Sequence, residues 1–142
     1  MTTADVLAVK PDYRPSEDEE FMNERQVEYF RQKLLDWKEE ILRESSETLT
    51  HLQSETENHP DLADRASSET DRALELRTRD RQRKLISKID EALRRIEDGS
   101  YGYCEETGEP IGVARLEARP IATLSLEAQE RHERRERVHR DD

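Results

Sequence analysis

The sequence is poor in the residues that build a compact core. Only 32% of its 142 residues are hydrophobic and 5% are aromatic, whereas 42% are charged. A globule of this length would need more apolar material than that. The composition therefore leaves two possibilities: disorder, or an extended helical structure with a narrow apolar seam.

Further absences exclude several classes of protein. The single cysteine, Cys104, rules out an intramolecular disulfide framework. There is no signal-peptide pattern at the N-terminus and no apolar run that could span a membrane, so we expect a cytoplasmic protein without membrane contact. A net charge of −11 opposes direct contact with nucleic acid. No nucleophile–base constellation or phosphate-binding glycine loop is present, so we expect no enzymatic activity.

Hydrophobic periodicity indicates two long helices. From about residue 23, apolar residues recur at alternating steps of three and four, at Val27, Phe30, Leu34, Trp37 and Ile41. Pro60 ends this first helix, because proline lacks an N–H and clashes with the preceding turn. A second helix reaches Glu97 with a seam at Ile86, Ile89, Leu93 and Ile96. Gly99 is suited to a left-handed C-cap.

The C-terminal third has a different character. Residues 101–120 contain three glycines and two prolines, which predict a compact, turn-rich unit. Residues from 123 to the end read as a highly charged helix with a thin apolar face. Such a helix needs a docking surface to be stable.

Charge is segregated along the two long helices. Residues 44–71 contain eight acids and one base, whereas residues 72–95 contain nine bases and four acids. A solvated, charged hairpin would explain this pattern. A finger whose acidic end seeks a cation-rich site would explain it as well, and charge alone leaves both interpretations open.

Four segments resemble the DksA/TraR family of transcription regulators: FMNERQVEYFRQKLLDW (21–37), DLADRA (61–66), LELRTRDRQRKLISKI (74–89) and YGYCEETGEPIGVARLEARPIA (101–122). The resemblance covers about residues 21–130. It implies a mostly α fold: a long antiparallel coiled-coil hairpin with a small zinc-finger-like globular domain and a C-terminal helix. The corresponding divisions are a mobile acidic tail (1–20), a helical part of the base (21–33), the hairpin (34–97, tip 58–66), and the degenerate finger with the C-terminal helix (98–142).

The resemblance also implies a function. Family members bind bacterial RNA polymerase without binding DNA, and the hairpin enters the secondary channel that leads to the active centre. There they alter the stability of promoter open complexes. They repress ribosomal-RNA promoters and favour some biosynthetic ones, and the nucleotide ppGpp strengthens the effect. We therefore expect a stringent-response regulator that acts as a monomer on RNA polymerase together with ppGpp.

Particular residues match the family's functional positions. At the tip these are Asp61, Asp64 and Ala66, although either aspartate could simply cap the second helix. On the shaft, Arg81 matches a polymerase contact; a solvated arginine is the alternative. The family's ppGpp pocket matches here at Leu85, Lys88, Arg119 and Gln129. Gln129 replaces a basic residue, so the pocket loses a charge that Arg131 could restore, and Leu85 could equally be hairpin core.

The family's four zinc ligands are almost entirely replaced. The two Cys-x-x-Cys pairs fall on Cys104, Thr107, Ser125 and Ala128. Hydroxyl groups are poor zinc ligands and alanine offers none, so we expect no zinc. His132 and His139 do not pair near Cys104. In place of metal, we expect the finger to be held by apolar packing of Tyr101, Tyr103, Ile111, Val113, Leu116, Ile121, Leu124 and Leu126.

Two rival functions remain open from the sequence. A transcript-cleavage factor of the same channel would use tip carboxylates to hold a catalytic magnesium ion. The finger motif speaks against it, since cleavage factors carry a different C-terminal domain. A coiled-coil adaptor with no polymerase role is the second rival, for which Asp64→Asn would be silent in transcription.

Overall fold

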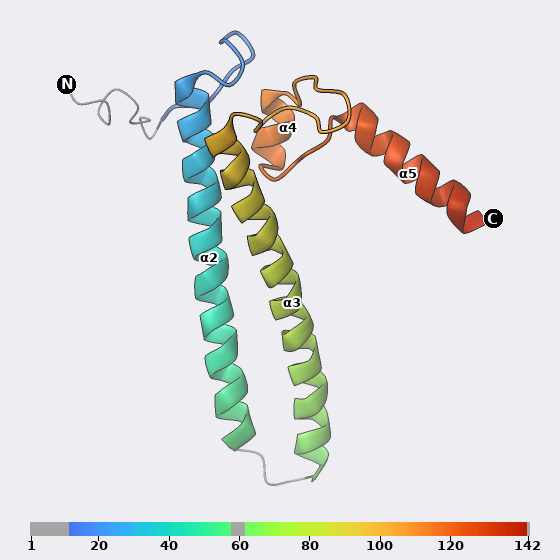
Figure 1. Ribbon diagram of the computed structural model, residues 1–142. Helices are drawn as coiled ribbons and strands as arrows, with labels where there is room; N and C mark the ends of the chain where they lie inside the picture. The colour runs from blue at the N-terminus through green and yellow to red at the C-terminus, as the bar shows by residue number, and fades with distance from the viewer. Residues whose placement is uncertain (1–11, 58–61, 142) are drawn as a thin grey trace. The chain divides into compact units, whose positions relative to one another are not determined.

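The computed structural model describes residues 12–57 and 62–141, with side chains except at 48–49, 51–67 and 139–141 (Figure 1). The helices described are α2 (Glu24–Glu57), α3 (Leu62–Asp98), α4 (Val113–Ala118) and α5 (Leu126–Asp141). The prediction of a mostly α chain is confirmed. The chain divides into two compact units: a base unit, Met1–Leu34 with Glu91–Asp142, and an arm unit, Leu35–Asp90.

The arm unit is an antiparallel helical hairpin. Lys38 on α2 pairs with Asp90 on α3 at 2.6 Å, and Ser45 bonds Gln82 at 2.8 Å, so α3 runs backward as α2 runs forward (Figure 1). Of the side chains described in this unit, three are buried: Ile41, Gln82 and Ile89. The expected antiparallel hairpin is confirmed, with a thin core.

The base unit contains most of the buried apolar residues. Phe30, Leu34 and Leu116 are fully buried, and the ring centroids of Phe30 and Tyr101 lie 5.9 Å apart. Most of the apolar residues expected to hold the finger contribute, namely Tyr101, Ile111, Val113, Leu116 and Ile121. Leu126, the first residue of α5, does not contribute, because it is 57% exposed. The short helix α4 lies where the sequence predicted turns.

Asn23 caps the start of α2. Its side-chain oxygen accepts the backbone N–H of Gln26 at 2.9 Å, and the Gln26 side chain accepts the N–H of Met22 at 2.8 Å. This is a variant of the reciprocal capping box. Gln26 is completely buried, and its amide also donates to the Ser16 carbonyl and to Glu19. The cap therefore ties the preceding segment to the helix.

Residues 12–20 belong to the segment predicted to be a mobile tail, and they make defined contacts with α2. The mobility of the tail stays a prediction. Tyr13 is buried, donates to Glu19 at 2.6 Å, and meets the ring of Tyr29 edge-on at 5.9 Å. The guanidinium of Arg25 lies 4.5 Å from the centre of the Tyr13 ring. A single aromatic residue thus anchors the segment, and residues 1–11 lie outside the described part of the chain.

Gly99 ends α3 as expected. Its φ of +86° is left-handed, and the next residue, Ser100, donates its N–H to the Arg95 carbonyl at 3.0 Å. That bond is the signature of a Schellman motif. Over the residues described, no helix is long and apolar enough to cross a membrane.

Candidate functional site

The predicted tip is described only in part. Asp61 lies outside the described residues. Asp64 and Ala66 lie within the first turns of α3, which begins at Leu62, and their side chains are not described. Because Asp64 lies inside α3, it is not the N-cap residue of that helix, and the alternative that it caps α3 is wrong. The roles of all three residues stay predictions.

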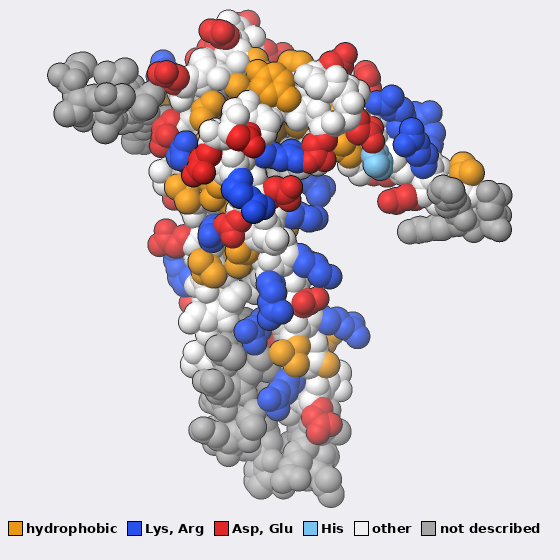
Figure 2. Space-filling view, viewed as in Figure 1, with side chains coloured by type: hydrophobic (Ala, Val, Ile, Leu, Met, Phe, Trp, Pro, Cys, Tyr) orange, Lys and Arg blue, Asp and Glu red, His pale blue; other side chains and the backbone are white. Residues whose placement is uncertain are grey.

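The shaft presents a basic face on α3. Arg77, Arg81, Lys84 and Lys88 follow one another at steps of four, three and four, which places them on one side of a helix. All four are exposed, and blue side chains follow α3 in Figure 2. Lys84 makes a weak, exposed pair with Asp80 at 3.5 Å. This face includes Arg81, the expected polymerase contact, and leaves it available to an acidic partner.

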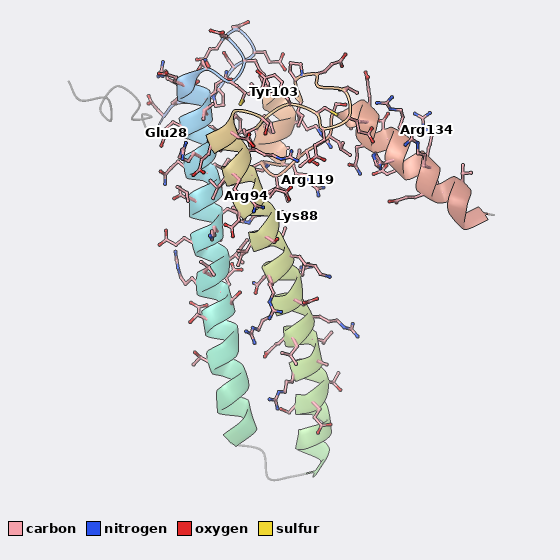
Figure 3. The ribbon with its side chains drawn as sticks, in the orientation of Figure 1. Glu28, Lys88, Arg94, Tyr103, Arg119 and Arg134 are labelled. Atoms are coloured by element: carbon pink, nitrogen blue, oxygen red, sulfur yellow. The ribbon has the colours of Figure 1, made fainter. Side chains whose placement is uncertain are left out.

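The four residues predicted for ppGpp fall in different units. Leu85 is half-buried and Lys88 exposed in the arm unit, whereas Arg119 is exposed and Gln129 half-buried in the base unit. Figure 3 labels Lys88 and Arg119. Gln129 donates to Glu133 at 3.4 Å. The burial of Leu85 agrees with a partial role in hairpin packing. Assembly of the four into one pocket stays a prediction.

A polar clasp holds α4, and with it Arg119, against α2 in the base unit. Glu117 accepts from the Tyr29 hydroxyl at 2.6 Å and from Lys33 at 2.8 Å, and Lys33 also reaches the Glu117 carbonyl at 2.9 Å. Arg119 forms the end of α4 two residues later, with its N–H on the Arg115 carbonyl. The clasp therefore fixes the backbone that carries Arg119.

The clasp shifts the pKa values of its members. Burial, then the bond to Glu117, raises the pKa of Tyr29 to about 12. Burial would raise the pKa of Glu117, but the bonds from Lys33 and Tyr29 outweigh it and lower that pKa. Sequence reasoning missed this site, because its partners lie 84 and 88 residues apart. The spacing of Tyr29 and Lys33 on one helix face was its only sequence signal.

The residues at the family's zinc-ligand positions make local hydrogen bonds or pack in the core. Thr107 accepts the N–H of Glu109 at 3.2 Å. Ser125 accepts the N–H of Ala128 at 3.2 Å and so caps α5, which begins at Leu126. Ala128 is fully buried as packing. Two hydroxyls engaged locally, one methyl group and one thiol do not fit a tetrahedral zinc ion.

Cys104 is the one remaining thiol and is buried, with 3% of its surface exposed. Its sulfur accepts hydrogen bonds from the Thr107 hydroxyl and from the N–H groups of Ser125, Thr107 and Glu106. Burial alone would raise the pKa of this thiol, but these bonds outweigh it and lower the pKa to about 6. The loop thus stabilises a thiolate by hydrogen bonds.

No other metal site replaces the lost one within residues 12–57 and 62–141, since no group of three or more His, Cys, Asp and Glu side chains is arranged to hold an ion. His132, considered from the sequence, instead contacts Glu106. Arg131 lies 3.9 Å from the same carboxylate. These contacts tie α5 to the finger loop. Arg131, the alternative source of charge for the ppGpp pocket, makes only a long, partly exposed pair with Glu106.

A pocket of about 400 Å³ lies in the base unit beside the end of α3. It is lined by Glu91, Arg94, Arg95, Asp98, Ser100, Tyr103, Cys104 and Glu105. Arg95 is already paired with Glu105 and lies 3.9 Å from Glu91. Because both acidic and basic side chains line the pocket, its charge does not indicate one class of ligand.

Comparison with known families accounts for this arrangement. Residues 26–96 match the model of DnaK suppressor protein DksA, N-terminal domain, and residues 99–134 match the prokaryotic dksA/traR C4-type zinc finger. Together the two matches span the helical hairpin and the finger. The chain belongs to the DksA/TraR family, as its motifs indicated.

Individual relatives agree over nearly the whole chain. The RNA polymerase-binding transcription factor DksA of Caulobacter vibrioides is 85% identical over 142 residues, all of both chains. The protein of the same name from Escherichia coli is 46% identical over 132 residues, 93% of this chain and 87% of the relative. The structure of transcription factor DksA2 from Pseudomonas aeruginosa matches with a TM-score of 0.78 and 43% identity, covering 96% of this chain and 99% of that one.

Proposed function

We propose that this chain is a transcription regulator that binds bacterial RNA polymerase through its secondary channel and alters the stability of promoter open complexes. The observation that carries the proposal is the full-length, 85% identity to a relative named as an RNA polymerase-binding transcription factor. The antiparallel arm supplies the element that would enter the channel. We propose repression of ribosomal-RNA promoters and activation of some biosynthetic ones.

The charges of the arm support this mode of binding. The exposed basic face that includes Arg81 and Lys88 would meet acidic polymerase surface, while Asp61, Asp64 and Ala66 would act near the active centre. With a net charge of −11, the chain would act without gripping DNA. It would do so as a monomer in the cytoplasm, and it would supply no catalytic group of its own.

We further propose ppGpp as a co-regulator at the polymerase interface. Lys88 and Arg119 would pair with phosphate oxygens, and Leu85 and Gln129 would complete the site. The clasp on Glu117 supports the role of Arg119, because it holds the short helix that ends there. The response to ppGpp would be weaker than with a fourth cation, since Gln129 is neutral.

We propose that the finger works without zinc, although the matched family model describes a C4-type finger. Thr107 and Ser125 use their hydroxyls within the loop and at the α5 cap, and Ala128 has no donor. The apolar core around Leu116 and the Glu117 clasp would hold the finger in place of the metal.

The test is transcription in vitro from a ribosomal-RNA promoter by purified polymerase, with and without ppGpp. We expect the wild-type chain to inhibit, ppGpp to deepen the inhibition, and Asp64→Asn to abolish most of it while polymerase binding persists. Asp71→Asn, an exposed acid further along α3, is the matched control. An Asp64→Asn protein as active as wild type would contradict the tip assignment, and absence of polymerase binding would overturn the proposed function.

A second arm of the test addresses ppGpp. Lys88→Ala and Arg119→Ala should each remove the added effect of ppGpp and leave most of the basal inhibition, whereas Arg83→Ala should change neither. Gln129→Lys should deepen the ppGpp effect several-fold, because it restores a charge. Equal ppGpp responses in all four variants would show that the nucleotide does not use this site.

A further inference from the structure

A polar side chain is buried in the middle of the arm unit. Gln82 on α3 is 8% exposed. Its side-chain oxygen accepts the hydroxyl of Ser45 on α2 at 2.8 Å, and its amide donates to Glu44 at 3.3 Å. Ser45 and Gln82 form what we call the polar layer. Both hydrogen-bonding ends of the Gln82 amide are thus satisfied by the facing helix.

The polar layer lies where the buried part of α3 ends, among the side chains that the structure describes. None of the α3 side chains at positions 68–81 is buried, so Gln82 is the first buried residue along the described part of α3. Leu74 and Leu76 in the same stretch are 52% and 47% exposed. Beyond the polar layer, therefore, none of the described α3 side chains is buried between the two helices.

Apolar packing alone would specify that alignment poorly. Leu85 and Ile86 lie next to Gln82 and are half-buried, so a leucine at position 82 would extend an apolar strip that packs nearly as well after a shift. A buried amide differs, because any shift would leave its hydrogen-bonding groups unsatisfied. Single polar residues in coiled coils fix register in this way, at a cost in stability.

We propose that the polar layer fixes the register of α2 against α3 and so makes Gln82 and Ser45 positioning residues for the far end of the arm. A slip of one helical turn moves one helix by about 5.4 Å along the other. Such a slip would displace the end of α2 relative to the start of α3, and so would change the placement of Asp61 and Asp64. This consequence rests on the proposed polymerase function, whereas the register itself does not.

The experiment removes the layer without leaving a cavity or a buried unpaired group, because Glu44, which also accepts from Gln82, is exposed. In the full chain, Ser45→Ala/Gln82→Leu replaces both polar partners by apolar ones. Spin labels attached through unnatural ketone residues at Arg43 and Arg77, both exposed and on opposite helices, report the alignment without using Cys104. The matched control is Arg83→Leu, which adds a leucine at an exposed neighbouring position.

Wild type and Arg83→Leu should give one narrow distance distribution. The double variant should give a distribution that is broadened or displaced by about 5 Å, the shift for one turn. Its melting temperature should rise by about 3 °C, while inhibition of polymerase falls about tenfold at equal binding. A merely stabilising contact would not give higher stability with lower activity.

An unchanged distance distribution in the double variant would overturn the proposal, and so would wild-type inhibition by a variant whose distribution has moved. Failure of the polymerase proposal is recognised separately. If the wild-type chain does not inhibit transcription, the proposed function fails, and the distance measurement still decides whether the polar layer sets the register.

Discussion

The base unit and the arm unit are built on opposite principles. The base packs buried residues from α2, α3, α4, α5 and the finger loop, and adds the Tyr13 anchor and the Glu117 clasp. The arm, over its described side chains, buries Ile41, Gln82 and Ile89. A chain with few apolar residues has concentrated them where stability is needed. The arm combines a thin apolar core with one polar layer, and a buried polar layer favours specificity over stability.

The largest expected effect separates the two units by core truncation. Leu116→Ala in the base should lower the free energy of unfolding by about 3 kcal/mol, because Leu116 is fully buried. Leu76→Ala in the arm should cost less than about 0.5 kcal/mol, because that side chain is 47% exposed. Urea denaturation followed by circular dichroism measures both. Equal losses would remove the contrast between the units.

A smaller loss is expected from the clasp. Glu117→Gln should cost about 1 kcal/mol at neutral pH, a value discounted because the Lys33–Glu117 pair is about one-third exposed. The pKa of Glu117 is lowered, so this contribution is present at neutral pH and is lost as the pH falls below the usual range of glutamate. Denaturation at pH 7 and pH 3 tests the sign, with the exposed Glu109→Gln as control. A loss of equal size at both pH values would refute the electrostatic account.

The thiolate of Cys104 predicts a modest pH dependence above neutrality. Its pKa is lowered from 9.0 to about 6, so its contribution to stability is full above pH 9, declines as the pH falls, and is gone below about pH 6. The melting temperature should therefore rise between pH 6 and pH 9. Cys104→Ser should flatten that rise. A wild-type profile parallel to that of the serine variant would show that the thiol is protonated throughout.

The smallest expected effect is that of metal removal. Incubation with a strong chelator should leave the melting temperature of the full chain unchanged within about 1 °C, because the finger offers no set of zinc ligands. Elemental analysis of the purified protein should find less than about 0.1 zinc per chain. A chelator-induced collapse of the base would show that the finger depends on metal after all.

Local sequence signals predicted the three long helices but not the short helix α4, and long-range contacts account for most of what was missed. The apolar seam around Phe30 and Ile89 predicted both helices, and Gly99 marked the end of α3. The Tyr29–Glu117 bond joins residues 88 apart, and no local pattern carries such information. Tyr13 lay in a stretch whose acidic composition masked its single anchoring ring. The substitutions at the family's zinc positions could be recognised from the sequence, because the spacing of the ligands is local. The absence of zinc stays a prediction.

The burial of Cys104 allows the local opening of the finger loop to be measured by thiol labelling. Only 3% of the residue is exposed, and it is the only thiol in the sequence. An alkylating reagent can therefore react only while the loop is transiently open, and the labelling rate reports how often it opens. Where closing is faster than labelling, that rate scales with the fraction of molecules whose loop is open. The local opening of the finger loop can thus be followed in the unmodified protein, either free in solution or bound to a partner.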